Sequence, residues 1–376
     1  MLRGLALVVG AALLLGACSD DEADPGPPTI TASPSDSTTP SEEPGTTAAS
    51  PSDKPGPPRV VDTIATGLAV PWGIGFLPDG TAVVTERDSR RVLTIDARGR
   101  VNQIGSVPEA QPGSEGGLLG VAVPPDWQPG GFLYFYASTA SDNRILRAPF
   151  DRGRLGASEV VLDGIPVGQI HDGGRLAFGP DGNLYASTGE TGLGELAHDR
   201  GSLGGKILRI TPDGDPAPGN PDPDSPIWTW GHRNVQGLAF DGNRLWASEF
   251  GQDTFDELNL IQKGDNYGWP IFEGRGDDRA YTNPQVVWNT DEASPSGLAY
   301  LDGHLWLAAL QGERLWRIDV KGDRASNPTD FFVGKYGRLR TVVVAPDGNL
   351  WVTTSNRAGR GARAADDDRI LVIDPS

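Results

Sequence analysis

The chain has 376 residues, of which 51 are glycine, 32 are proline and one is cysteine. This composition favours many short strands joined by turns, and a single cysteine excludes an intrachain disulfide. Its 32 basic and 50 acidic side chains give a formal net charge of −18, which opposes binding to nucleic acid or to an anionic membrane surface. The length fits two average domains or one large β domain built from repeats.

The first 18 residues have the pattern of a cleaved signal. Arg3 precedes an apolar run from Leu5 to Leu15, which is too short to span a bilayer of roughly 30 Å, and two small residues stand directly before Cys18. This ending resembles a bacterial lipobox, whose cysteine becomes lipidated. We therefore expect residues 1–18 to be a lipoprotein signal peptide and the protein to be an extracytoplasmic, cell-membrane lipoprotein anchored at Cys18. An ordinary secretory signal with an incidental cysteine is the alternative.

Residues 19–57 are rich in serine, threonine, proline and aspartate and have almost no large apolar side chains. Such a segment buries too little surface to offset its chain entropy, so we expect a disordered tether. The folded domain is then expected over residues 58–376.

The folded domain repeats one pattern six times, namely an apolar run, a turn that contains aspartate, and a second apolar run. Asp-Gly between alternating apolar runs is a strong hairpin signal, because both central residues of a type I′ turn need positive φ. The six turns contain Asp79, Asp126, Asp181, Asp241, Asp302 and Asp347, with successive spacings of 47, 55, 60, 61 and 45 residues.

Spacings of this size, with about four strands in each repeat, are typical of propeller blades. We therefore predict an all-β, six-bladed β-propeller in which the strand Val60 to Ala65 pairs with the last blade and closes the ring. Two packed β-sandwiches would fit the number of strands but not the sixfold recurrence.

His171 lies just before the first apolar run of the third repeat. Because inner strands begin near the central channel, this imidazole is expected to face the axis, where its neutral form can take a proton from a substrate hydroxyl. Glu190 ends the same hairpin and can hold the other ring nitrogen. The alternative is a histidine that is simply hydrogen-bonded within a loop.

Two groups of polar side chains occupy the corresponding position in later repeats. Arg233 and Asn234 precede the inner strand of the fourth repeat, and Arg338 and Arg340 precede that of the sixth. Arg338 and Arg340 point the same way along an extended chain. Two guanidinium groups in a channel favour an anion that bears carboxylates, although a pair bridged to acidic side chains of the channel is the alternative.

The turn SEFGQDTFDELN combines the backbone carbonyls of Gly251 and Gln252 with the carboxylates of Asp253, Asp256 and Glu257. Hard oxygen donors packed into one turn suit Ca²⁺ better than a transition metal. The spacing does not match an EF-hand.

From about residue 62 to residue 374 the chain resembles the soluble quinoprotein glucose and aldose sugar dehydrogenases, six-bladed propellers that use pyrroloquinoline quinone (PQQ) and Ca²⁺. The resemblance rests on EGGLLGVAVPPDW, QIHDGGRLAFGPDG, GHRNVQGLAF, SEFGQDTFDELNLIQKGDNYGWP and GRLRTVVVAPDGN, in the order of the family. It implies a PQQ-dependent aldose sugar dehydrogenase that oxidises the anomeric carbon of a sugar to a lactone by hydride transfer to the quinone. The electrons would pass to an artificial or membrane acceptor.

The resemblance also implies roles for individual residues. His171 would be the general base, Glu190 would orient it, Arg233 would stabilise negative charge on the quinone oxygen, and Ca²⁺ would polarise the quinone. The cofactor-contacting positions that it implies are Glu115, Arg233, Asn234, Gln311, Arg338 and Arg340. The metal-binding positions that it implies are the carbonyls of Gly251 and Gln252, with Glu257 and Tyr267 in an adjoining structural calcium region.

Two of these positions depart from the family pattern. Glu115 stands where the glucose enzymes have glutamine, which adds negative charge near an acidic cofactor. Gln311 stands where they have a lysine facing the cofactor, so one charge-assisted contact is lost. Two other functions stay open, a calcium-dependent lactonase on a similar propeller and a non-enzymatic binding propeller displayed at the cell surface.

Overall fold

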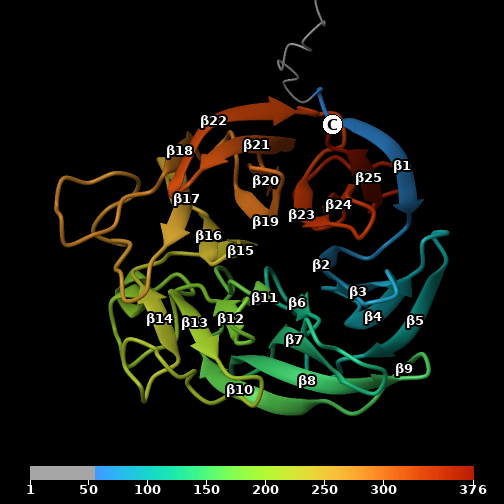
Figure 1. Ribbon diagram of the computed structural model, residues 1–376, viewed down its shortest axis with the longest axis horizontal. Coiled ribbons are helices and arrows are strands. Elements are labelled where there is room, and N and C mark those ends of the chain that lie inside the picture. The colour runs from blue at the N-terminus through green and yellow to red at the C-terminus, as the bar shows by residue number, and fades with distance from the viewer. Residues whose placement is uncertain (1–55) are drawn as a thin grey trace, which may run out of the picture. The chain divides into compact units, whose positions relative to one another are not determined.

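The computed structural model describes residues 56–376, so the predicted signal peptide, Cys18 and nearly all of the predicted tether lie outside the described residues. Residues 56–376 form six antiparallel sheets arranged in a ring around a central opening (Figure 1), which confirms the predicted six-bladed propeller. The helical structure in this part of the chain is one short 3₁₀ segment, Gly194–Ala197. No helix in residues 56–376 is long and apolar enough to cross a membrane.

Each blade runs from an inner strand beside the channel to an outer strand at the rim (Figure 1). The first three blades are β2 (Pro71–Phe76), β3 (Ala82–Glu86), β4 (Arg91–Ile95) and β5 (Val101–Ser106); β6 (Leu118–Ala122), β7 (Phe132–Ser138), β8 (Asn143–Asp151) and β10 (Glu159–Ile165), with β9 (Arg154–Leu155) beside β8; and β11 (Leu176–Phe178), β12 (Leu184–Ser187), β13 (Lys206–Ile210) and β14 (Ile227–Trp230). The last three are β15 (Val235–Asp241), β16 (Arg244–Glu249), β17 (Phe255–Ile261) and β18 (Val286–Asn289); β19 (Pro295–Leu301), β20 (His304–Ala309), β21 (Arg314–Lys321) and β22 (Arg324–Phe331); and β23 (Leu339–Val344), β24 (Leu350–Thr354) and β25 (Ile370–Asp374), completed by β1 (Arg59–Ala65).

The two ends of the domain meet in the sixth blade. Strand β1 pairs antiparallel with β25, with Arg59 opposite Asp374 and Ala65 opposite Ile370. Hydrogen bonds between the first and last strands therefore close the ring, as the sequence predicted for Val60 to Ala65.

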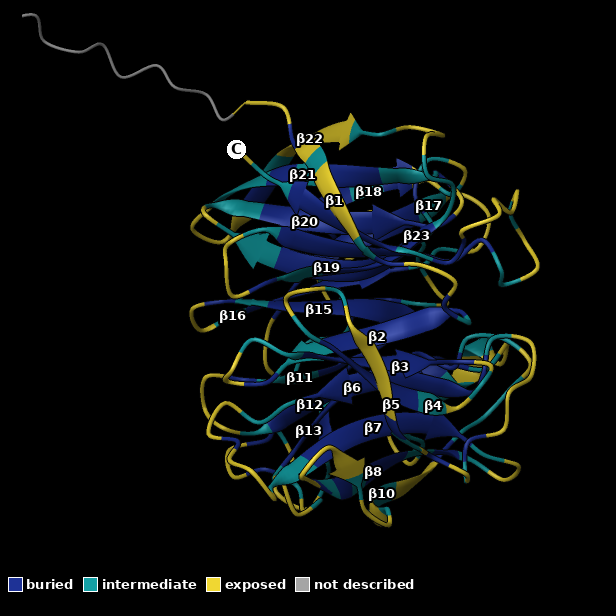
Figure 2. Cartoon of the chain, turned by 90° about the vertical axis from the view of Figure 1, so that its right-hand side faces the viewer, coloured by how far each residue is buried: buried dark blue, intermediate teal, exposed yellow. Residues whose placement is uncertain are grey.

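Each pair of neighbouring blades shares one apolar cluster, so packing also closes the ring. For example, Trp246 of β16 is fully buried in a cluster with Leu298 and Leu305 of the next blade. Figure 2 shows that the inner strands are buried, whereas outer strands such as β1, β5 and β22 and the loops are largely exposed. Burial of large aromatic side chains is a main source of stability, and here it joins neighbouring blades.

The hairpin turns form where the sequence predicted them, but the type I′ geometry does not hold for all. Both Asp302 and Gly303 have positive φ, at 48° and 82°, as that turn requires. In the turns of Asp79, Asp181 and Asp347 only the glycine has positive φ. There the aspartate Oδ1 accepts a hydrogen bond from the backbone N–H two residues later, at 2.9, 3.1 and 3.0 Å. This side-chain bond stabilises a different turn.

Candidate active site

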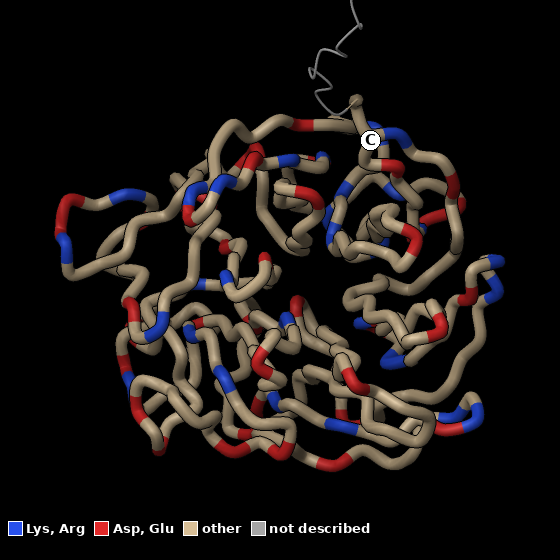
Figure 3. Tube along the Cα trace, viewed as in Figure 1, with Lys and Arg blue, Asp and Glu red and all other residues tan. Residues whose placement is uncertain are grey.

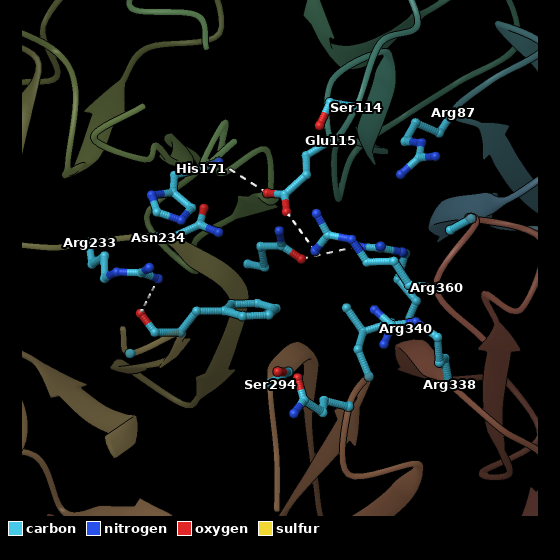
Figure 4. Close-up of a pocket in the computed structure, with 16 residues that line it drawn as sticks. Arg87, Ser114, Glu115, His171, Arg233, Asn234, Ser294, Arg338, Arg340 and Arg360 are labelled. Atoms are coloured by element: carbon cyan, nitrogen blue, oxygen red, sulfur yellow. Dashed lines mark hydrogen bonds and ion pairs between the residues drawn. The ribbon is translucent and has the colours of Figure 1, made fainter. Parts of the chain in front are cut away.

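Loops at one mouth of the central channel enclose a cavity of about 210 Å³ (Figure 4). Most lining residues come from two kinds of segment, those that lead into the inner strands of the second to sixth blades and those that join the second and third strands of a blade; Gln236 and Arg340 lie in the inner strands β15 and β23. All six blades supply lining residues, so the site exists only in the closed ring. The lining residues are Arg87, Ser114, Glu115, His171, Arg233, Asn234, Gln236, Phe250, Gly251, Ser294, Leu310, Gln311, Arg338, Arg340, Ala358 and Arg360.

The structure brings most of the predicted site residues to this cavity. Those that line it are Glu115, His171, Arg233, Asn234, Gly251, Gln311, Arg338 and Arg340. Glu190 is buried directly behind His171. Three predicted metal-binding residues, Gln252, Glu257 and Tyr267, are not among the lining residues.

His171 and Glu190 form a hydrogen-bonded pair at the edge of the cavity. The Nδ1 atom of His171 lies 2.7 Å from Oε1 of Glu190, and Glu190 is 1% exposed. A carboxylate at this distance accepts the Nδ1–H, which in the neutral imidazole leaves the lone pair on Nε2. The backbone of His171 has a φ of 60°, a left-handed conformation that is uncommon for a residue with a side chain. The loop therefore holds this imidazole in a specific orientation.

Glu115 contacts both His171 and Arg360. Its Oε2 accepts a hydrogen bond from the His171 backbone N–H at 3.0 Å, and its Oε1 lies 3.2 Å from Nη1 of Arg360. Glu115 comes from the loop before β6 and Arg360 from the loop between β24 and β25. The pair thus spans part of the cavity (Figure 4).

Arg233 and Asn234 line the cavity next to His171. Burial lowers the pKa of Arg233, although the nearby carboxylates of Glu190 and Glu249 oppose that shift. The Nη1 of Arg233 donates to the Phe250 carbonyl at 3.4 Å, its guanidinium lies 5.4 Å from the Trp269 ring, and its buried Nε has no hydrogen-bond partner within the described residues. Arg233 therefore has an unused donor.

Four arginines gather on the other side of the cavity, where Figure 4 shows Arg87, Arg338, Arg340 and Arg360. Burial, together with the positive charges of Arg87 and Arg338, lowers the pKa of Arg340 well below its usual value. Arg340 donates to neutral groups, Ser355 Oγ at 3.2 Å and Gln236 Oε1 at 3.1 Å.

Arg338 has no ion pair within residues 56–376, and its buried Nε has no partner there. The alternative in which channel acids bridge Arg338 and Arg340 is therefore not seen. Buried cations without carboxylates are costly, so this side of the cavity suits a ligand with several carboxylates, such as PQQ.

The donor set near Gly251 is rich in oxygen. Burial raises the pKa of Asp256 to about 7, and burial together with the charge of Glu249 raises that of Glu257 to about 8. A nearby cation would stabilise the charged forms of these two buried acids. Carboxylates and backbone carbonyls are the donors that Ca²⁺ takes. Residues 56–376 contain no group of three His, Cys, Asp or Glu side chains placed to hold a metal.

The hydroxyl of Tyr267 is already fully used. It donates to the Leu260 carbonyl at 2.7 Å and accepts from the Gln262 N–H at 2.9 Å, and the ring stacks on His232 at 4.6 Å. Burial also raises the pKa of this hydroxyl above its usual value. Glu257 in turn accepts hydrogen bonds from Gly274 N–H and the Asn259 amide. The resemblance places Glu257 and Tyr267 in a calcium region separate from Gly251 and Gln252, and that assignment stays a prediction.

Several lining residues were not predicted from the sequence. Gln236 follows Asn234 by two residues at the start of β15, so strand alternation could have indicated it. Arg87 and Arg360 lie in loops after the second strands of the first and sixth blades. No local pattern marked these loops as part of a site.

Several known proteins are similar to this chain in fold and in sequence. The Glucose / Sorbosone dehydrogenase family matches residues 68–363. The PQQ-bound aldose sugar dehydrogenase of Streptomyces coelicolor is 54% identical, with a TM-score of 0.83 over 84% of this chain and 97% of that chain. Aldose sugar dehydrogenase YliI of Escherichia coli is 29% identical over 337 residues, 80% of this chain and 91% of that protein. Quinoprotein glucose dehydrogenase B of Acinetobacter calcoaceticus is 33% identical over 256 residues, 58% of this chain and 54% of that protein. The chain belongs to the glucose/sorbosone dehydrogenase family.

Proposed function

We propose that this protein oxidises aldose sugars to lactones at the anomeric carbon, with PQQ as the hydride acceptor. The observation that carries the proposal is the position of His171, held by Glu190 at 2.7 Å, across a cavity from four arginines. A base and an anion-binding wall then face the same space. The PQQ-bound relative from Streptomyces coelicolor supports the choice of cofactor.

His171 would take the proton from the anomeric hydroxyl. Its Nδ1–H is donated to Glu190, so the lone pair of Nε2 is available for that proton. As the ring gains charge, the Glu190 carboxylate stabilises it through a charge-assisted hydrogen bond. Glu115 holds the backbone N–H of His171, so the ring and the backbone are both fixed before substrate binds.

The four arginines Arg87, Arg338, Arg340 and Arg360, here called the arginine wall, would bind the carboxylates of the cofactor. When bound, PQQ would supply the two-electron acceptor for the hydride and Ca²⁺ a Lewis acid beside it. Arg338 and Arg340 offer planar donors that lack carboxylate partners, which suits carboxylate binding. Arg233 and Asn234 would contact the cofactor from the side of His171. The carbonyls of Gly251 and Gln252 would hold the Ca²⁺ ion.

The protein would work outside the cytoplasm, anchored to the cell membrane by a lipid on Cys18, and would pass electrons to a membrane acceptor or an artificial dye. The support is the amino-terminal sequence pattern. A Cys18→Ala variant should move from the membrane fraction to the soluble fraction. Unchanged membrane association would contradict the lipid anchor.

A turnover assay tests the proposed activity. The purified chain, loaded with PQQ and Ca²⁺, is mixed with a panel of aldoses and a redox dye, and dye reduction is followed. We expect reduction with at least one aldose and none with His171→Asn, although that variant should still bind PQQ. No reduction with any aldose would rule the proposal out.

The cavity gives less support to the other two functions. A calcium-dependent lactonase needs acidic side chains that converge on the axis, whereas five arginines and a single acid, Glu115, line this cavity. For a non-enzymatic binding propeller, the strongest argument was Gln311, and that side chain does line the cavity without a charge. Turnover that depends on His171 separates the enzyme from both alternatives.

A further inference from the structure

One wall of the cavity is the loop that joins β16 to β17. Phe250 and Gly251 line the cavity, and the Phe250 carbonyl accepts a hydrogen bond from Arg233. The shape of this loop therefore sets both the wall and the position of a guanidinium group.

Two carboxylates bind five consecutive backbone N–H groups of this loop. Oε1 of Glu273 accepts from the N–H groups of residues 252–255, at 2.6, 2.9, 2.9 and 3.2 Å in chain order. Oδ1 of Asp256 accepts from the Gly251 N–H at 2.9 Å, and its Oδ2 accepts from the Ser294 N–H. Every backbone donor from Gly251 to Phe255 is thus committed to an acid of this chain.

The same contacts orient the carbonyls. In a trans peptide the C=O points opposite to the N–H of the next residue. Because the N–H groups of residues 252–255 converge on Glu273, the carbonyls of residues 251–254 point away from that carboxylate. Among them are the carbonyls of Gly251 and Gln252.

The loop is also too tight for a side chain at Gly251. A Cβ there would lie 1.9 Å from the Phe255 carbonyl oxygen and 2.8 Å from Oε1 of Glu273. The loop therefore closes around the Glu273 carboxylate.

Glu273 reaches this position from the long loop between β17 and β18, which projects from the ring (Figure 1) and carries both acidic and basic positions (Figure 3). The next residue is held as well, since the Gly274 N–H donates to Oε1 of Glu257 at 2.7 Å. The Glu273 carboxylate thus lies at the centre of four backbone donors. A charged acid with this many donors forms strong hydrogen bonds.

We propose that Glu273 is a positioning residue that shapes the Gly251–Phe255 loop and turns its carbonyls away from the projecting loop, so that they can serve a cation beside the cofactor. This inference rests on the proposed function. It assigns Glu273 no contact with substrate or cofactor.

Two variants of the full chain test the inference, with Asp277→Asn as the matched control because Asp277 is an exposed acid of the same projecting loop. PQQ binding is followed by fluorescence at a series of Ca²⁺ concentrations, and hydrogen–deuterium exchange is measured for the amides of residues 252–255. Glu273→Ala should raise the Ca²⁺ concentration for half-maximal PQQ binding by about tenfold, which corresponds to about 1.4 kcal/mol. Glu273→Gln keeps an acceptor but loses the charge, so it should give a smaller rise. If Glu273→Ala does not fold, Glu273→Gln alone tests the inference.

The amides of residues 252–255 should exchange faster in both variants, and Asp277→Asn should match the wild type in every measurement. An unchanged Ca²⁺ requirement in Glu273→Ala, with the wild type binding PQQ normally, would overturn the inference. If the wild type binds no PQQ, the proposed function fails instead. Unchanged exchange at residues 252–255 would then still contradict the role of Glu273.

Discussion

The carboxylate of Glu115 accepts the backbone N–H of His171 at 3.0 Å, so an acid from the second blade fixes the residue that we propose as the base in the third. The other oxygen of Glu115 faces Arg360. One side chain therefore connects the proposed base to the arginine wall. Because Glu115 is the single acid among the lining residues, its charge matters for any anionic ligand.

Glu115→Gln should increase the affinity for PQQ. Glutamine can still accept the His171 N–H, whereas the negative charge beside an acidic cofactor is removed and Arg360 is released. Exposed ion pairs are worth up to about 1 kcal/mol, so we expect a gain of about threefold to fivefold. A fluorescence titration in low salt measures it. Weaker binding would show that the Glu115–Arg360 pair helps to shape the site.

Arg340→Met should affect stability and ligand binding in opposite directions. The variant removes a buried cation that has no carboxylate partner, and Gln236 Oε1 keeps its hydrogen bond from Ser296. We expect the ligand-free protein to melt at the same or a higher temperature, because a buried unpaired charge is costly. PQQ binding should weaken by at least about tenfold, since a charge-assisted contact is lost. A lower melting temperature with unchanged PQQ affinity would contradict this account of Arg340.

Asp172→Asn should stabilise the protein at neutral pH. Burial raises the pKa of Asp172, its Oδ2 has no partner within residues 56–376, and the Ser138 hydroxyl and Asn143 carbonyl oxygen are likewise without partners there. Asparagine keeps the acceptor used by Gly168 and Asn143 and puts a neutral donor in place of the unpartnered carboxylate oxygen.

The pH dependence of that effect follows from the raised pKa. Between the unfolded pKa of about 3.9 and the raised pKa of the folded state, the folded state binds more protons than the unfolded state. The contribution of Asp172 is therefore fully present below that pH and is lost as the pH rises through the folded pKa. Denaturant unfolding at pH 4 and pH 7 should show a gain for Asp172→Asn of about 1 kcal/mol that is larger at pH 7. The exposed Asp163→Asn is the control, and an equal gain at both pH values would refute the explanation.

Lys206→Met should destabilise the fold. The buried Nζ of Lys206 donates to three carbonyls, those of Leu196, Ala197 and Gly204. Methionine fills a similar volume but leaves these acceptors unpaired, which should lower the free energy of unfolding by about 2–3 kcal/mol. Denaturant unfolding measures the change, with the exposed Lys263→Met as control. A loss no greater than in that control would show that water replaces the ammonium group.

The repeats carried most of the information about the fold. Six turns at similar spacing predict six blades because each repeat can form a hairpin locally and must then pack on its neighbours. The closing strand at Val60 to Ala65 followed from the need to complete the last blade. The turn type at Asp79 was wrong because a side-chain hydrogen bond, which the dipeptide Asp-Gly does not reveal, selects another turn.

From the residues alone, the candidate site could be predicted mainly where a residue has a fixed place in the repeat. His171, Arg233 and Arg338 all stand just before an inner strand, so they converge when the ring closes. Arg360 and Glu273 reach the site region from loops, and their contacts depend on how distant segments meet. Tyr267 was placed in a structural calcium region by resemblance alone. Its hydroxyl is bonded to Leu260 and Gln262, and the assignment stays a prediction.

Direct observation of the bound quinone tests the central claim most directly. The full chain is mixed with PQQ and Ca²⁺, dialysed, and examined by absorption spectroscopy before and after an aldose is added. We predict that about one equivalent of PQQ is retained, that the aldose changes its spectrum, and that His171→Asn retains the cofactor without that change. Loss of the quinone band on dialysis, in the wild type and with Ca²⁺ present, would contradict the account.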